Sequence, residues 1–155
     1  MARLIITESE KRHIKSLYEQ TKTFNLFSYK DTIKNIIESM SSLMENKVSG
    51  ELCKTLDNDL KPTFGLVDDL LSRISNDTNM SEGDAIKYVY QTWEQQKAGG
   101  MSLLLNVVGP NVTVAKEMVD KLYGHIRTKP NGGLLTSILS EIFGKAKVKQ
   151  VPICS

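Results

Sequence analysis

The chain has little of what a catalytic or metal-binding protein needs. Its 155 residues include two cysteines, two histidines and one tryptophan. Neither cysteine belongs to a CxxC pair or to a Cys/His cluster, so the spacings of zinc sites and redox motifs are missing. The nucleophile elbow GxSxG, the phosphate loop GxxxxGKS/T and the dinucleotide fingerprint GxGxxG are missing too. We therefore expect no enzyme, no cofactor and no bound metal.

The sequence also lacks a long hydrophobic run. No stretch approaches the roughly 18 apolar residues that a membrane-spanning helix requires. The apolar stretch near the N-terminus is too short for a secretory signal before charge returns. With no such signal, we expect Cys53 and Cys154 to be two reduced thiols, although the sequence leaves a disulfide open.

What is present is typical of a single globular domain. Hydrophobic residues make up 40% of the chain and charged residues 25%, which are ordinary values. Apolar residues recur at three- and four-residue steps almost throughout, and no strand alternation extends beyond the first few residues. We predict an all-α fold, a single compact bundle of about six to eight short amphipathic helices over residues 1–144, followed by a basic extended tail over residues 145–155.

The helix boundaries follow from local signals. Thr7 and Glu10 form a capping box that opens a first helix over residues 7–20. The clearest apolar stripe starts at Ile33, and Ser49-Gly50 is expected to end its helix. Further signals are Pro62 as a helix stop, loops at 75–79 and 129–133, a cap at Ser81, a stop at Gly99-Gly100, and helices near 101–108, 113–123 and 134–143.

The net charge of +2 conceals an uneven layout. Residues 1–22 carry five bases and three acids, residues 45–84 carry nine acids and four bases, and residues 116–155 carry seven bases and three acids. One interpretation is a solvated surface with unevenly placed charges. The other is self-association, in which a basic end of one copy meets the acidic middle of the next.

The two histidines do not form a recognisable site. His13 lies among lysines and an arginine, and His125 lies near a helix end, where it can interact with the last carbonyls. No nucleophile or orienting acid is visible beside either ring, so both are expected to be structural. The adjacent carboxylates Asp68 and Asp69 are expected to face water, because Val67 and Leu70 define the buried side.

Two other segments allow alternative functions. Residues 103–123 loosely resemble a helix-turn-helix, with Lys116 and Lys121 able to approach phosphate, but Glu117 and Asp120 on the same helix repel it. Nucleic acid is therefore not the favoured partner. The apolar segment 132–143, with its following lysines, suggests either a closing helix of the core, a docking helix, or a membrane-active helix.

The N-terminus resembles a known group. Leu4-Ile5-Ile6-Thr7-Glu8-Ser9-Glu10, followed by basic residues and then Ile14 and Leu17, resembles the leader of many small tailed-bacteriophage proteins of the marine type. In several tailed phages such a segment directs proteins into the capsid or an assembly. The resemblance covers about fifteen residues, implies a phage origin and supplies no catalytic residue.

These observations lead to one expectation for the function. The chain is expected to be a non-enzymatic interaction protein of a phage virion or its assembly, in the virion or the host cytoplasm. It would act by helix packing against itself or other phage structural proteins. The alternatives are a small phage regulator that binds DNA or a host protein through residues 103–123, and a membrane-perturbing factor that depends on Leu135 and Ile142. The residues expected to dock are Ile5, Ile14, Leu17 and Tyr18, with the tail lysines Lys145, Lys147 and Lys149.

Overall fold

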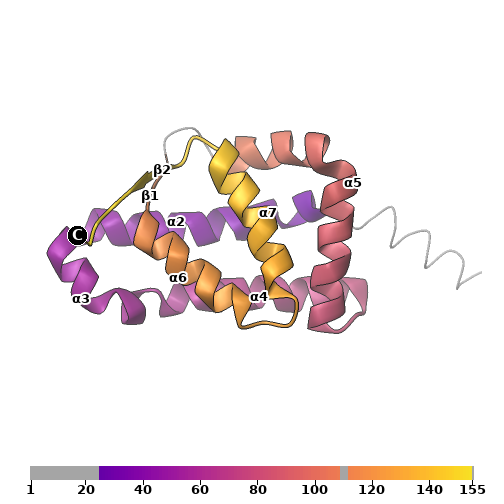
Figure 1. The fold of residues 1–155 in the computed structure, drawn as a ribbon, viewed down its shortest axis with the longest axis horizontal. Helices are drawn as coiled ribbons and strands as arrows, with labels where there is room; N and C mark the ends of the chain where they lie inside the picture. Colours follow the sequence, from indigo (N-terminus) through magenta and orange to yellow (C-terminus); the bar gives the residue numbers. More distant parts are fainter. Residues whose placement is uncertain (1–24, 109–111, 155) are drawn as a thin grey trace, which may run out of the picture.

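The computed structural model describes residues 25–108 and 112–154, which form seven helices and two short strands (Figure 1). The predicted all-α bundle is confirmed. The first helix expected over residues 7–20 lies outside the described residues. The helices are η1 Leu26–Tyr29, α2 Lys30–Asn46, α3 Ser49–Asp59, α4 Lys61–Thr78, α5 Glu82–Val108, α6 Lys116–Arg127 and α7 Gly132–Lys145. The strands are β1 Thr113–Ala115 and β2 Lys149–Val151.

The helices pack in two layers because their apolar stripes are one-sided. In Figure 1, α2 and α4 lie behind α6 and α7, with α5 at one end of the bundle and α3 at the other. Full burial of a Leu, Ile or Met side chain contributes roughly 1.5–3 kcal/mol, so these stripes supply most of the driving force. The largest fully buried side chains are Ile37, Met40, Leu52, Leu60, Leu70, Leu71, Ile74, Ile86, Leu104, Met118, Leu122 and Ile126.

The structure places several helix boundaries at other residues than the sequence predicts. The helix of the main stripe, α2, ends at Asn46, and Ser49 and Gly50 open α3 instead of ending α2. Pro62 is where a proline fits best, in the first turn of α4, because the amide N–H that it lacks has no helical partner there. The segment expected to be a loop from residue 75 belongs to α4 as far as Thr78, and Asn79 ends that helix in the left-handed conformation at φ 57°.

Of two further predictions about helix ends, one is confirmed and one is wrong. The Ser81 cap is confirmed, since its Oγ accepts a hydrogen bond from the Asp84 amide at 3.3 Å. The expected stop at Gly99-Gly100 is wrong, because α5 runs on to Val108. The break in α5 lies three residues earlier, at Gln96, whose φ of −113° and ψ of 18° are not helical.

The two strands were not expected. β1 and β2 pair in parallel, with Thr113 opposite Lys149 and Ala115 opposite Val151. Three residues are too few to show the alternation that identifies a strand, and the partners lie at distant points of the sequence. As a consequence α6 begins at Lys116, after β1, instead of near Thr113.

The connection between α6 and α7 depends on one glycine. Asn131 adopts the left-handed conformation, and its side-chain amide donates to the Gly83 carbonyl at 3.0 Å. The next residue, Gly132, lies so close to the end of α6 that a Cβ atom there would stand 1.9 Å from the Ile126 carbonyl oxygen. This close approach fixes α7 against α6 and against the start of α5.

Candidate functional site: a groove on α2 and an anchored tail

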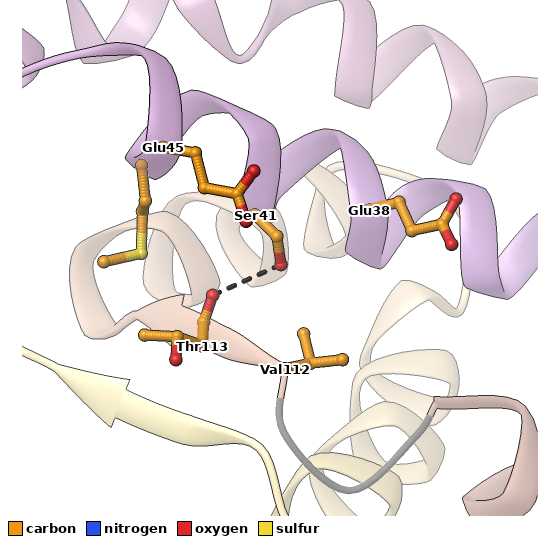
Figure 2. Close-up of a pocket in the computed structure, with 6 residues that line it drawn as sticks. Glu38, Ser41, Glu45, Val112 and Thr113 are labelled. Carbon is orange, nitrogen blue, oxygen red and sulfur yellow. Dashed lines mark hydrogen bonds between the residues drawn. The ribbon is translucent and has the colours of Figure 1, made fainter.

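A groove lies between α2 and the start of β1. Its volume is about 380 Å³. This volume is at the lower end of the range for ligand pockets and suits a few anchoring side chains. The lining residues are Glu38, Ser41, Met44, Glu45, Val112 and Thr113 (Figure 2).

The sequence of α2 places the polar wall of this groove. Glu38, Ser41 and Glu45 follow each other at three- and four-residue steps, so they share one face of the helix. The opposite face buries Ile36 and Met40 in the core. Figure 2 shows the Ser41 hydroxyl between the two glutamates, where it donates to the Thr113 carbonyl at 3.2 Å. This hydrogen bond attaches β1 to α2 and gives the groove its second wall.

The groove is lined by both acidic and apolar side chains. Glu38 is exposed, and its ion pair with Lys34 at 3.8 Å is a surface pair of little energetic worth. Glu45 is exposed and has no ion pair among the described residues. Met44 and Val112 are half-buried and supply the apolar surface. The groove therefore presents two exposed carboxylates beside a small apolar surface.

The second feature is the C-terminal tail, which a disulfide anchors to α3. Cys53 and Cys154 are bonded, with their Cα atoms 5.8 Å apart. The expectation of two reduced thiols is therefore wrong. Spacing alone could not reveal the pair, because the two cysteines are 101 positions apart in the sequence. The pairing of β2 with β1 brings the tail toward α3.

Backbone hydrogen bonds complete the anchor. The Lys149 amide donates to the Val112 carbonyl at 2.9 Å. The Glu117 carboxylate, in the first turn of α6, accepts from the amides of Ile153 at 3.1 Å and Cys154 at 3.4 Å. Burial raises the pKa of this carboxyl, but the amide hydrogen bonds outweigh burial, so the pKa of Glu117 is lowered.

The third feature is a histidine–carboxylate pair, although no acid was expected beside His125. Its Nε2 lies 2.9 Å from Asp68 Oδ1, and Lys129 Nζ lies 3.0 Å from the same oxygen. Phe64 stacks on the His125 ring with centroids 4.5 Å apart. Burial raises the pKa of Asp68, but the hydrogen bonds from His125 and Lys129 outweigh it and lower that pKa.

The cluster serves as a clamp between helices. The ring of His125, on α6, contacts Asp68 and Phe64 on α4, and Asp68 was expected to face water. The arrangement positions α6 on α4.

Of the residues predicted to dock, the structure describes only the three tail lysines. Ile5, Ile14, Leu17 and Tyr18 lie outside the described residues. Lys145 ends α7, Lys147 follows it, and Lys149 begins β2; all three are exposed. They form a basic strip along the tail that reaches the groove at Lys149, because the amide of this residue donates to the carbonyl of Val112, one of the residues that line the groove. The sequence did not point to the residues of the groove.

The two segments on which the alternative functions depend, residues 103–123 and 132–143, contribute many side chains to the core. In the segment read as a helix-turn-helix, α6 buries Met118 and Leu122, and Lys121 pairs with Asp57. The strand β1 stands where a short turn would be required. Leu135 and Ile142, on which the membrane-active reading depends, are 2% and 1% exposed in the core.

Comparisons of this chain with known proteins identify no similar protein. Searches of protein-family models, of curated proteins and of solved structures find no match to this chain. In the residues that the structure describes, no helix is both long and apolar enough to cross a membrane. The same residues contain no group of three or more His, Cys, Asp or Glu side chains that could hold a metal ion.

Proposed function

We propose that this chain is a non-enzymatic, self-associating interaction protein of a tailed-phage virion or its assembly. One observation carries the proposal: the groove on α2 combines the exposed carboxylates of Glu38 and Glu45 with the apolar side chains of Met44 and Val112. The complementary feature is the N-terminal segment, which carries five basic residues within residues 1–22 and an aliphatic stripe. Opposite charges of this kind steer association and set the register of an interface.

The proposed occupant of the groove is the N-terminal segment of a second copy. Glu38 and Glu45 lie 8 and 15 residues after the start of α2. At 1.5 Å per residue these positions are roughly 12 and 22 Å along the helix axis. The described chain begins at the η1 end of α2, where η1 packs on α5. To reach the groove of its own copy, the N-terminal segment that precedes η1 would have to run back along α2. The N-terminal segment of a second copy would not have to reverse its direction in this way.

The residues of the segment that would dock are those expected from the sequence. Ile14, Leu17 and Tyr18 fall at helical spacing and offer apolar side chains for Met44 and Val112. The basic residues around them would face the two glutamates.

The disulfide supports a place in the virion over the host cytoplasm. Bridges such as Cys53–Cys154 persist in oxidising surroundings, virion surfaces included, and are rare in reducing cytosol. The N-terminal resemblance to phage leaders points the same way.

Light scattering behind a sizing column tests this proposal. The full chain is expected to form a defined oligomer at low salt that dissociates at high salt, because exposed charges are screened. The double variant E38Q/E45Q should dissociate at low salt, while the matched variant D69N/E94Q, which removes two exposed carboxylates outside the groove, should not. The alanine variant of Ile14 and Leu17 should dissociate as well, and it should melt at the same temperature as the dissociated E38Q/E45Q variant, because both have lost only the stabilisation that association provides. A wild-type monomer at low salt would contradict the proposal.

A further inference from the structure

The C-terminal tail, residues 146–154, covers the edge of β1, whose buried backbone groups need hydrogen-bond partners. β2 is the strand with which β1 pairs in the described chain. Val114 and Ala115 of β1 are fully buried, so the backbone groups of this strand cannot turn to water if the tail leaves. Any segment that replaces the tail must supply an extended backbone in the same place.

Apart from the pairing with β1 and the hydrogen bonds to Val112 and to the Glu117 carboxylate, few non-covalent contacts hold the tail. All three residues of β2 are exposed, and Val151 retains 39% of its surface. Only Val148 and Ile153 of residues 148–154 are half-buried against the core. A two-stranded sheet is marginal on its own, so the Cys53–Cys154 bond provides much of the attachment.

A short connection joins the tail to the bundle. α7 ends at Lys145, and β2 begins at Lys149. Ala146 has an extended backbone, with φ of −70° and ψ of 154°. Rotation at residues 146–148 would therefore move β2 and Cys154 together, while the buried residues of α7 stay in the core. Short connections of this kind favour exchange of the attached element between copies.

We propose that residues 146–154 are an exchangeable arm, whose β2 pairs with β1 of a second copy and whose Cys154 bonds to Cys53 of that copy. The second copy is the fitting partner because its tail has the same sequence, register and cysteine as the one it replaces. The inference rests on the self-association proposed above. It uses α3 and the pairing of β2 with β1, whereas the proposed docking in the groove uses Glu38 and Glu45 of α2.

The exchange is a thiol–disulfide interchange with no net oxidation. A low-molecular-weight thiolate attacks Cys154 Sγ, which forms a mixed disulfide and releases Cys53 as a thiolate. After the arm moves, the Cys53 thiolate of the second copy attacks Cys154 Sγ. The protein disulfide forms again, and the small thiolate leaves unchanged.

Two single-cysteine chains test the arm directly. The C53S chain keeps Cys154 on its tail, and the C154S chain keeps Cys53 on α3. The two chains, one of them carrying a mass tag, are mixed and oxidised with glutathione disulfide, which takes up two electrons as each new bridge forms. Random pairing of equal amounts of the two chains would make the mixed dimer equal to the sum of the two homodimers. We expect the mixed dimer on a non-reducing gel to exceed that sum. A mixed dimer no more abundant than that sum would overturn the proposal.

A matched pair of variants separates docking from chance collision of thiols. In the C53S chain, K149P removes the amide that donates to Val112, whereas K149A keeps this amide and removes the charge. Loss of one such hydrogen bond predicts an about five-fold lower yield of mixed dimer for K149P and no change for K149A. Equal yields would overturn the proposal.

Two further measurements keep the result interpretable. Tagged and untagged wild-type chains in a glutathione buffer must also form a disulfide-linked dimer, which answers the case in which a single-cysteine variant does not fold. E38Q/E45Q in the wild-type background must leave this covalent dimer intact. If the covalent dimer is lost in E38Q/E45Q, the proposal of an exchangeable arm is overturned. If the covalent dimer forms but the wild-type chain shows no salt-sensitive oligomer, only the proposed docking in the groove is overturned.

Discussion

Removal of the Cys53–Cys154 bond should lower the stability of the whole domain, and the size of the effect follows from the loop that it closes. The two residues are 101 positions apart. In the chain-entropy account, a closed loop of about 100 residues restricts the unfolded chain by about 4.7 kcal/mol at 25 °C. Measured effects commonly fall between about 2 and 5 kcal/mol. We therefore expect C53S/C154S to lose about 2–5 kcal/mol of unfolding free energy.

The same loss can be expressed as a melting temperature. For 155 residues, at about 2.1 cal/mol/K per residue, the unfolding entropy is about 0.33 kcal/mol/K. A loss of 4.7 kcal/mol then lowers Tm by about 14 °C, and a loss of 2 kcal/mol lowers it by about 6 °C. The assay is urea and thermal unfolding followed by far-ultraviolet circular dichroism.

Two controls make this prediction decisive. Thiol titration of the denatured, non-reduced wild type should find no free cysteine. Reduced wild type should unfold at the same urea concentration as C53S/C154S, because both lack the closed loop. If oxidised wild type and C53S/C154S differ by less than about 1 kcal/mol, the bridge does not constrain the unfolded chain and the reasoning is refuted.

Three other predictions concern single contacts. G132A should destabilise the protein severely, since its Cβ meets backbone, whereas G133A, with open space around it, should be neutral or stabilise by up to about 1 kcal/mol in thermal unfolding. The Trp93 indole N–H donates to Glu141 at 3.0 Å, so E141A, which leaves this buried donor without an acceptor, should cost roughly 1–3 kcal/mol more than E141Q in urea unfolding; equal losses would contradict this role. The pKa of Glu117 is lower in the folded protein than its ordinary value of 4.5. The stabilisation of the tail by this carboxylate is therefore fully present above pH 4.5 and is lost as the pH falls through the lower pKa of the folded state. Amide exchange in the tail, followed by mass spectrometry, should accelerate relative to the core in that acidic range, and at pH 7 in E117Q.

The sequence predicted the fold class well because the signals were local. Each amphipathic stripe depends on residues within one helix, and the Ser81 cap depends on an amide three residues away. The boundaries that failed depended on context. Gly99 and Gly100 fall within α5 although glycine is a poor helix former, and Ser49 and Gly50 open a helix instead of ending one.

The candidate sites could not be predicted in the same way because their parts are distant in sequence. The glutamates of α2 were visible as the polar side of a helix, but the other groove wall is Val112 and Thr113, about seventy positions later. The acid that orients His125 is 57 positions earlier. The parallel β1–β2 pair gave no alternation to read, and it is this pair that brings the tail to α3.

The central claim is that the basic N-terminal segment of one copy docks in the acidic groove of another. Zero-length carbodiimide cross-linking of an equimolar mixture of unlabelled and ¹⁵N-labelled chains tests it most directly, because the reagent joins a lysine to a carboxylate only when they touch. We predict mixed-label peptide pairs in which Lys11 or Lys15 is joined to Glu38 or Glu45. Pairs that carry a single label throughout would mean that the segment fills its own groove, and links from these lysines to other carboxylates alone would contradict the account.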